Sequence, residues 1–169
     1  MLLAFENTYP NIEKALYIAP NATLVGAVEM AKESTVWFNA TIRADVASIT
    51  IGDGSNIQDN VVIHVNTGKP TVIKERVTVG HGAIIHACTI REGCLIGMGS
   101  IILDEADIGE YCLVAAGSLI PPGKHFPPRS LIMGSPARLV RPLTEKELAD
   151  MAENNLHYIQ YGYIYSQQS

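Results

Sequence analysis

An aliphatic residue or a threonine returns every six positions along most of this 169-residue chain. The clearest series is Val72, Thr78, Ile84, Ile90, Ile96, Ile102, Ile108, Val114, Ile120. A helix repeats at about 3.6 residues and a flat strand at about 2, so neither explains a sustained period of six. In a hexapeptide solenoid each hexad forms a short strand and a corner, and three hexads make one triangular coil. The repeat therefore predicts an all-β solenoid whose aliphatic side chains point inward.

A small residue follows most of these positions by four, where it would let the chain turn tightly. The small residues are Gly82, Cys88, Cys94, Ser100, Ala106, Cys112 and Ser118. All three cysteines of the chain therefore fall at inward positions. A metal or redox set is the alternative, but a buried thiol packs like a small apolar side chain, and an odd count argues against a disulfide framework. We expect the cysteines to be packing residues.

Hexads also precede Val72, with two interruptions. They start at Ile18, Leu24, Met30, Val36, Ile42, Ile51, Ile57 and Ile63. Val46 is expected at a small inward position. The longer step after it predicts about three extra residues near Ala47. The second long step holds the turn formers Gly68 and Pro70 and predicts an exposed loop.

The sequence is expected to form one domain of three parts. Residues 1–17 lack the repeat and are expected to cap the open end of the solenoid. Residues 18–140 are expected to form the β-helix of about six coils, although the repeat fades after Ile120 into a proline-rich loop.

A C-terminal α-helix is expected over residues 144–165. Thr144 precedes Glu147 by three residues, which is a capping-box pattern. The predicted apolar stripe of this helix is Leu148, Met151, Leu156, Ile159 and Tyr163.

Composition limits the partners of this chain. The formal net charge is -5, whereas phosphate binding needs clustered Lys and Arg, so we expect no nucleic acid partner. No apolar stretch approaches the ~20 residues of a membrane span. The N-terminus shows neither a basic leader nor a cleavage signal. We therefore expect a cytoplasmic protein with no membrane partner.

Three of the five histidines lie in one short region. His64 directly follows the inward Ile63 and therefore points outward. His86 follows Ile84 by two, so it is expected on the same face in the next coil, beside His64. His81 lies at the corner before this face, about 16 Å of extended chain from His86 at ~3.3 Å per residue.

Three imidazoles at neighbouring levels are a ligand set for zinc, which binds nitrogen at about 2.0–2.1 Å. If all three bind one ion, a second copy of the chain must supply His81. A threefold trimer with one site per interface would bring them together. The alternative is scattered surface histidines, two of which stack by chance.

Several polar residues are expected near the histidines. Arg43 lies on the same face one coil earlier, with Asp45 at the corner beyond it. We expect Arg43 to form an interface ion pair with Asp45 or Asp59 rather than to take part in catalysis. Asn56 and Asp59 suit solenoid turns, whereas Gln58 is a less natural turn residue.

Together these segments resemble the gamma-class carbonic anhydrase-like proteins of the left-handed β-helix superfamily. The resemblance covers nearly the whole chain. A hexapeptide repeat alone is shared with many acyltransferases, but NxQD, a histidine five residues after its Asp, and HxxxxH form a specific combination. The segments that carry it are RAD (Arg43 to Asp45), NIQDNVVIH (Asn56 to His64), GHGAIIH (Gly80 to His86) and GSPAR (Gly134 to Arg138).

The resemblance implies left-handed coils, a homotrimer, and Zn²⁺ or Fe²⁺ between the subunits. It implies that His64 and His86 of one subunit and His81 of its neighbour hold the ion. Arg43 and Asp45 become interface ion-pair residues by the same resemblance.

The implied reaction is the reversible hydration of carbon dioxide to bicarbonate by a metal-bound hydroxide, which makes the protein a lyase. The resemblance places Gln58 and Asn56 beside that hydroxide and gives Asp59 an orienting role. Tyr158 resembles a tyrosine that reaches the site in several relatives, although core packing is the alternative for it.

One segment departs from the family pattern. Efficient members carry an acidic loop after the first metal histidine, with a glutamate that passes the proton out. Here the loop VNTGKPT (Val65 to Thr71) has no carboxylate, so we expect low activity or proton release to buffer.

Two other functions remain open from the sequence. The first is a hexapeptide-repeat acyltransferase that uses acetyl-CoA, an activity common on this fold. The second is a non-catalytic trimer with a structural metal.

Overall fold

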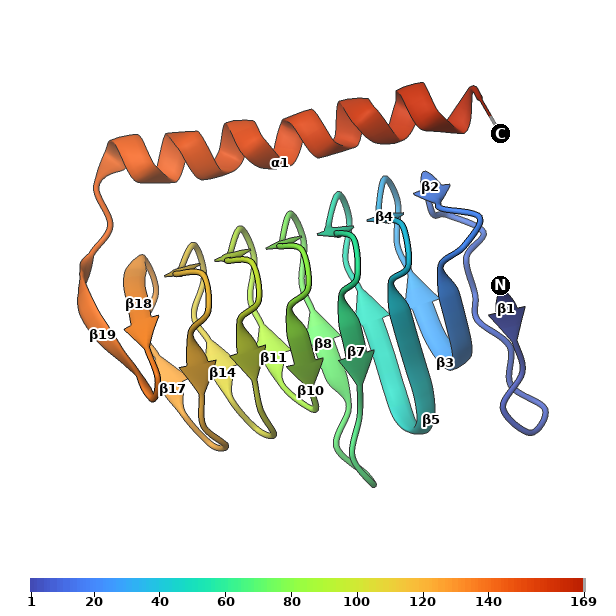
Figure 1. Ribbon diagram of the computed structural model, residues 1–169, viewed down its shortest axis with the longest axis horizontal. Coiled ribbons are helices and arrows are strands. Elements are labelled where there is room, and N and C mark those ends of the chain that lie inside the picture. The colour runs from blue at the N-terminus through green and yellow to red at the C-terminus, as the bar shows by residue number, and fades with distance from the viewer. Residues whose placement is uncertain (169) are drawn as a thin grey trace.

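The computed structural model describes residues 1–168 and shows a parallel β-solenoid of about 7 turns with one helix lying along it (Figure 1). The predicted solenoid with a C-terminal helix is therefore confirmed. Its strands stack into three columns, one for each side of the coil, because residues of successive coils pair in parallel.

One side is an 8-stranded sheet. Its strands are β2 (Tyr17–Ile18), β4 (Thr35–Val36), β6 (Asn56–Ile57), β9 (Thr78–Val79), β12 (Leu95–Ile96), β15 (Leu113–Val114), β18 (Ser130–Gly134) and β19 (Ala137–Pro142).

The other two sides belong to one 11-stranded sheet. On the side that we call the histidine face, the strands are β7 (Val62–His64), β10 (Ile84–His86), β13 (Ile101–Ile102) and β16 (Leu119–Ile120). On the third side they are β8 (Thr71–Ile73), β11 (Thr89–Ile90), β14 (Asp107–Ile108) and β17 (His125–Phe126). The long strands β3 (Thr23–Met30) and β5 (Thr41–Ile51) join these two sides, and β1 (Leu2–Leu3) pairs with β3.

Aliphatic ladders fill the interior. On the histidine face the ladder is Leu24, Ile42, Ile63, Ile85, Ile102 and Ile120, each paired with the next. All six side chains are fully buried. Burial of such a side chain contributes about 1.5–3 kcal/mol, so the stacked hexads supply the core of the fold.

The predicted register was wrong by one residue in three hexads. The inward residues are Ile73, Val79 and Ile85 instead of Val72, Thr78 and Ile84. Ala83 likewise replaces Gly82 as the buried small residue. The next corner compensates, because it is one residue shorter and carries Ala87 at φ 47°. His86 therefore directly follows an inward isoleucine, as His64 does.

The two interruptions of the repeat have different structures. Gly26 pairs with Ala44 and Val28 with Ile49, so β5 bulges by three residues, as predicted near Ala47. Val46 lies in this bulge and is exposed, so its predicted inward position was wrong. The second interruption is the exposed loop between β7 and β8, as predicted (Figure 1).

The repeat does not fade after Ile120. Phe126 pairs with Ile108, and Ile132 pairs with Val114, so the proline-rich segment completes a further coil. Proline is tolerated here because it lies in the corners between short strands.

Helix α1 (Glu145–Ser166) runs back along the solenoid (Figure 1). The Thr144 hydroxyl accepts a hydrogen bond from the Glu147 N–H, and the Thr144 N–H donates to the Glu147 carboxylate, so the predicted capping box is confirmed.

The apolar stripe of α1 was predicted only in part. Met151, Asn155 and Gly162 are its buried residues, whereas Leu156 and Tyr163 are exposed. The helix packs on a row of corners, where a small or polar side chain fits better than a leucine. A Cβ on Gly162 would lie 2.7 Å from Thr35 Cγ2. Among the described residues, no helix combines the length and apolarity that crossing a membrane requires.

All three cysteines are buried and unpaired, so their predicted packing role is confirmed. Burial raises the pKa of the Cys88 thiol to about 12, which keeps it protonated and unreactive.

Candidate functional site

His64 and His86 lie side by side on the histidine face. They are directly paired residues at the ends of β7 and β10. His64 Nδ1 lies 3.2 Å from His86 Nε2. The structure therefore brings together the two histidines that the hexad count predicted to be neighbours.

Each of these rings is held from behind by a carboxylate. His64 Nε2 lies 3.0 Å from Asp45 Oδ1, and His86 Nδ1 lies 2.6 Å from Asp104 Oδ1. An ionised carboxylate only accepts hydrogen bonds, so the ring nitrogen that faces it carries the proton. In the neutral rings the two facing nitrogens, His64 Nδ1 and His86 Nε2, both present lone pairs.

Both carboxylates are stabilised in their charged form. Burial opposes ionisation of Asp45, but hydrogen bonds from His64 and the Val46 N–H, with the charge of Arg43, lower its pKa overall. A hydrogen bond from Asn66 is the main cause that lowers the pKa of Asp104, and His86 adds to it. Both side chains are therefore charged acceptors near neutral pH.

Local structure explains how Asp45 reaches His64. The three-residue bulge of β5 begins just after Ala44, so Asp45 leaves the regular strand pairing at the edge of the histidine face where His64 lies. Arg43 forms an ion pair with Asp45 from the same strand. The predicted pairing of Arg43 with Asp45 is thus present within one chain.

Asp104 was missed by the sequence reasoning. It lies 18 residues after His86, which is three hexads or one coil. That spacing was available as a signal, because side chains three hexads apart stack in adjacent coils.

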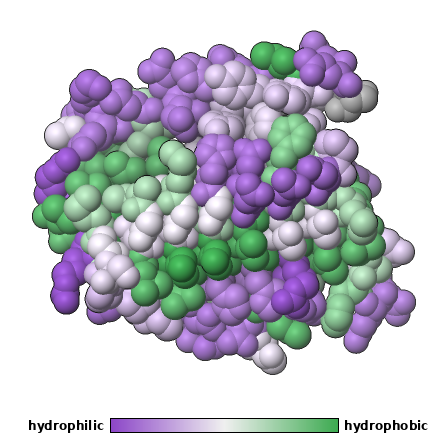
Figure 2. Space-filling view, viewed as in Figure 1, coloured by the Kyte–Doolittle hydropathy of each residue, from purple (hydrophilic) through white to green (hydrophobic). Residues whose placement is uncertain are grey.

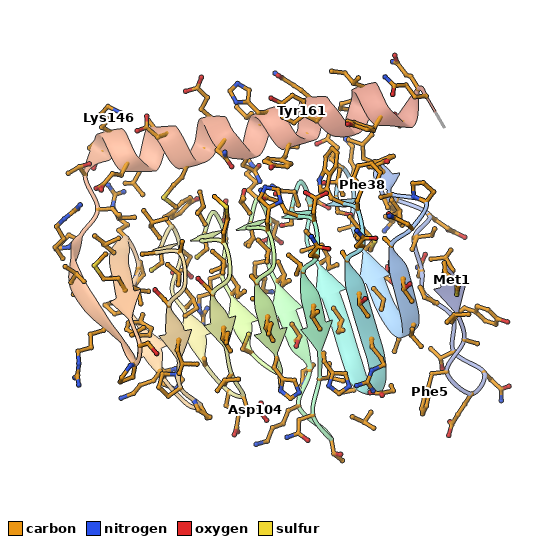
Figure 3. All side chains as sticks on the ribbon, viewed as in Figure 1. Met1, Phe5, Phe38, Asp104, Lys146 and Tyr161 are labelled. Atoms are coloured by element: carbon orange, nitrogen blue, oxygen red, sulfur yellow. The ribbon has the colours of Figure 1, made fainter. Side chains whose placement is uncertain are left out.

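His81 lies at a different edge of the molecule. Its Nδ1 pairs with Asp59 Oδ2 at 2.8 Å, and its Nε2 lies 3.5 Å from the Tyr158 hydroxyl of α1. Asp104 marks the edge of the solenoid opposite α1 (Figure 3). His81 and the pair His64–His86 thus occupy opposite edges of the histidine face.

Gln58 and Asn56 form a buried polar chain next to His81. Gln58 Oε1 accepts a hydrogen bond from the His81 N–H at 3.2 Å. Gln58 Nε2 donates to Asn56 Oδ1 at 3.2 Å, and Asn56 Nδ2 donates to Thr78 Oγ1 at 2.9 Å. Gln58, His81 and Tyr158 line one cavity of about 350 Å³ between the 8-stranded sheet and α1.

The predicted site residues therefore form two separate groups in one chain. His64, His86, Asp45 and Arg43 make the first group, and His81, Asp59, Gln58, Asn56 and Tyr158 make the second. Within residues 1–168 no three His, Cys, Asp or Glu side chains gather closely enough to hold a metal ion.

The histidine pair nevertheless fits a metal. Two nitrogens that bind one tetrahedral zinc at about 2.0–2.1 Å are about 3.3–3.4 Å apart. The observed separation between His64 Nδ1 and His86 Nε2 is 3.2 Å. Metal-binding imidazoles also commonly donate their other N–H to a carboxylate, as all three histidines here do. His64 and His86 therefore fit two of the ligand positions of a metal ion.

Comparison with known proteins gives three findings. The family model "Bacterial transferase hexapeptide (six repeats)" matches residues 87–122. A Geobacillus kaustophilus protein named carbonic anhydrase is 44% identical over 165 residues, which cover 98% of this chain and 91% of that protein. The mitochondrial gamma carbonic anhydrase 2 of Arabidopsis thaliana is 36% identical over 95% of this chain, and this chain spans 60% of its length.

Among solved structures, a Bacillus cereus protein described as a candidate acetyltransferase superposes with a TM-score of 0.97. It is 39% identical, and the match covers 100% of this chain and 98% of that chain. Its likeness establishes the left-handed parallel β-helix for this chain.

Proposed function

The chain belongs to the gamma-class carbonic anhydrase family of hexapeptide-repeat proteins, and we propose that it catalyses the reversible hydration of carbon dioxide at a metal site shared by two subunits of a homotrimer. The family supports the reaction class, a lyase, and implies a metal cofactor. Zn²⁺ or Fe²⁺ is the proposed ion.

One observation carries the metal assignment: two lone pairs face each other at 3.2 Å between His64 and His86. Both nitrogens are acceptors in the neutral rings because the opposite ring N–H groups are bound to carboxylates. Such a pair repels unless a cation or a proton lies between the two nitrogens. A divalent cation satisfies both rings at once.

His81 of a neighbouring subunit would supply the third ligand. Its Nδ1 is bound to Asp59, which leaves Nε2 as the nitrogen available to a metal. Three neutral imidazoles would leave the charge of the ion undiminished, and the chemistry supplied by such an ion would be a water of lowered pKa that serves as a nucleophile near neutral pH.

Gln58 and Tyr158, which lie beside His81, position the reactants. Gln58 has a second amide proton and a second carbonyl lone pair beyond the bonds to Asn56 and His81, so it can orient an oxygen in the adjoining cavity. The Tyr158 hydroxyl lies 3.5 Å from the same nitrogen of His81, which supports a role for Tyr158 beside the metal. The loop Val65 to Thr71 offers no carboxylate, so proton transfer to buffer is expected to limit turnover.

A trimer is supported by the outward side of the histidine face. Val62 and Ile84 are paired neighbours and are 41% and 40% exposed. Ile101 continues this row in the next coil, beside Ile84. Figure 2, drawn from the same direction as Figure 1, shows a hydrophobic band across the middle of this surface. An apolar row beside a histidine pair that can bind a metal fits an interface between copies of the chain.

Complementation between two inactive variants tests the shared site. His64→Ala and His81→Ala should each lose metal and activity. After joint unfolding and refolding of equal amounts, about a quarter of the sites should combine an intact His64–His86 pair with an intact neighbouring His81. Metal content and carbon dioxide hydration should recover together to that fraction.

The matched control is a mixture of His64→Ala with His86→Ala, which damages the same half of the site in both chains and should recover nothing. Absence of recovery in the first mixture would exclude a site shared between subunits. Recovery of metal without hydration would identify a trimer with a structural metal.

A second function is acetyl transfer, which the description of the family model and of the Bacillus cereus structure favours. Acetyl transfer from acetyl-CoA that survives removal of the metal by a chelator would support it. The histidines argue against it, because all three in the candidate site face carboxylates in the arrangement that suits a metal.

A further inference from the structure

The loop between β7 and β8 is fastened across the coil of His86. The Asn66 Nδ2 group donates to Asp104 Oδ2 at 2.8 Å, although the two residues are 38 positions apart. Asp104 is the residue whose other oxygen holds His86. The loop that leaves the first metal histidine therefore reaches the residue behind the second one.

The orientation of the Asn66 amide is determined by the loop itself. The Thr67 N–H donates to Asn66 Oδ1 at 2.8 Å. The backbones of Asn66 and Lys69 also exchange hydrogen bonds of 3.2 and 2.8 Å. Because its oxygen is occupied within the loop, Asn66 must turn its NH₂ group toward Asp104.

The two carboxylate oxygens of Asp104 accept hydrogen bonds from different residues. Oδ2 accepts from Asn66, and Oδ1 accepts from His86 Nδ1 at 2.6 Å. A carboxylate held on one side presents its other oxygen in one direction. The proton of the neutral His86 ring is thereby kept on Nδ1, and the lone pair is kept on Nε2, which faces His64.

We propose that Asn66 and Asp104 are positioning residues that hold His86 in its metal-binding tautomer before the metal arrives. The proposal rests on the proposed function for the identity of Nε2 as the ligand atom. The proposal also assigns a role to the loop Val65 to Thr71, which has no carboxylate. This loop orients a metal ligand, whereas efficient relatives of the family use the corresponding loop for proton transfer.

A second contact fastens the same loop and provides a matched control. Lys69 Nζ lies 2.5 Å from Glu105 Oε2, one residue beyond Asp104, and this ion pair does not include His86. If these contacts only fix the position of the loop, Lys69→Met and Asn66→Ala should have the same effect on the His86 tautomer. If the hydrogen-bond relay matters, only changes at Asn66 or Asp104 should affect His86.

The first test reads the His86 ring directly, without metal. Metal-free protein labelled with ¹⁵N-histidine is examined by NMR at pH 8, above the ordinary imidazole pKa of about 6.5. The His86 signals are assigned by their loss in His86→Gln. Wild type and Lys69→Met should show the Nδ1-protonated tautomer, whereas Asp104→Ala should show a mixture of tautomers.

An exchange variant preserves the bonds while it moves the charge. In N66D/D104N, the carboxylate at position 66 accepts from the amide at position 104, whose oxygen still accepts from His86. In Asp104→Asn alone, an amide whose oxygen faces His86 would turn its NH₂ group against the NH₂ group of Asn66, so the Nδ1-protonated tautomer should be lost. The double variant removes this conflict and should restore that tautomer.

The second test measures zinc affinity by competition with a chromophoric chelator. Loss of an outer partner of a metal histidine weakens binding by about 10–100-fold, which is the expected effect of Asp104→Ala. Asn66→Ala should weaken it less, and Lys69→Met should stay within about twofold of wild type.

The two tests separate the two proposals. A wild type that binds no zinc would overturn the proposed metal site, while the NMR result would still decide the tautomer. Nε2 protonation of His86 in the wild type, or an Asp104→Ala variant with unchanged tautomer, would overturn the positioning role.

Discussion

A carboxylate holds each of the three histidines through one ring nitrogen. Asp45, Asp104 and Asp59 fill this position for His64, His86 and His81, respectively. The pattern matters because a neutral imidazole has one donor and one acceptor, and the carboxylate decides which nitrogen is left for a metal. The histidines alone are a weak signal, but three histidines with three acceptors form a specific arrangement.

Asn56 provides a test of the buried polar chain. It is 1% exposed and connects Gln58 with Thr78 through hydrogen bonds. Asn56→Ala leaves the Gln58 amide without a buried partner, which costs about 1–3 kcal/mol of the free energy of unfolding. It should also lower kcat/KM for carbon dioxide hydration, because Gln58 loses the partner that orients it.

Urea unfolding and a stopped-flow hydration assay would measure these two effects. Asn21→Ala is the matched control, since the Asn21 side chain makes its two hydrogen bonds with Asn39 on the exposed surface. An Asn56→Ala variant as stable as Asn21→Ala would contradict the assigned role.

Helix α1 is anchored at its start by charge as well as by its cap. The Arg141 guanidinium and the N–H and hydroxyl groups of Thr144 lower the pKa of Glu147 to about 2, from an ordinary value of 4.5. A carboxyl group whose pKa is lowered by folding stabilises the folded state above its unfolded pKa. That contribution decreases as the pH falls from about 4.5 to about 2.

Glu147→Gln should therefore flatten the acid side of the stability profile. The wild type should lose more of its melting temperature than Glu147→Gln between pH 5 and 2.5, as followed by circular dichroism at 222 nm. Thr144→Ala should lower the free energy of unfolding by about 1 kcal/mol at pH 7, because it removes the cap. Equal acid slopes for wild type and Glu147→Gln would exclude the assigned contribution.

At the scale of the whole molecule, the histidine face carries an exposed apolar row. Stacked coils repeat every side-chain direction, so an apolar outward position becomes an apolar row. Val62 and Ile84 form such a row beside the histidine pair. Their burial in a trimer would complete both the hydrophobic surface and the metal site.

Charges introduced into this row should dissociate the proposed trimer. We expect Val62→Asp/Ile84→Asp to elute as a folded monomer, because two carboxylates cannot be buried there without partners. Size-exclusion chromatography with light scattering measures the mass, and metal analysis should show loss of the ion. Val140→Asp is the control, since Val140 is 50% exposed on β19 at the far end of the solenoid. A trimer that persists in the double variant would place the interface elsewhere.

Much of this architecture is readable from the chain, because a hexapeptide repeat is a local property. Each hexad specifies its own strand and corner, and stacking follows from repetition. Most of the inward ladder, the bulge near Ala47 and the adjacency of His64 and His86 follow from counting hexads, and the capping box at Thr144 follows from a local motif. The polar residues Gln58, Asp59 and Asp45 were also found, since they stand close in sequence to the motifs.

The tertiary structure decided what counting could not. The loop after His64 is one residue longer than counting predicted, so Ile85 and not Ile84 points inward. The step from Ile85 to Ile90 is one residue shorter than a hexad and restores the register. The buried side of α1 depends on the corners against which it packs, which selected Asn155 and Gly162 over Leu156. The bond from Asn66 through Asp104 to His86 joins three coils, and its existence depends on the path of a loop. A repeat specifies only the spacing along the chain, whereas contacts between coils depend on where each insertion places its side chains in space.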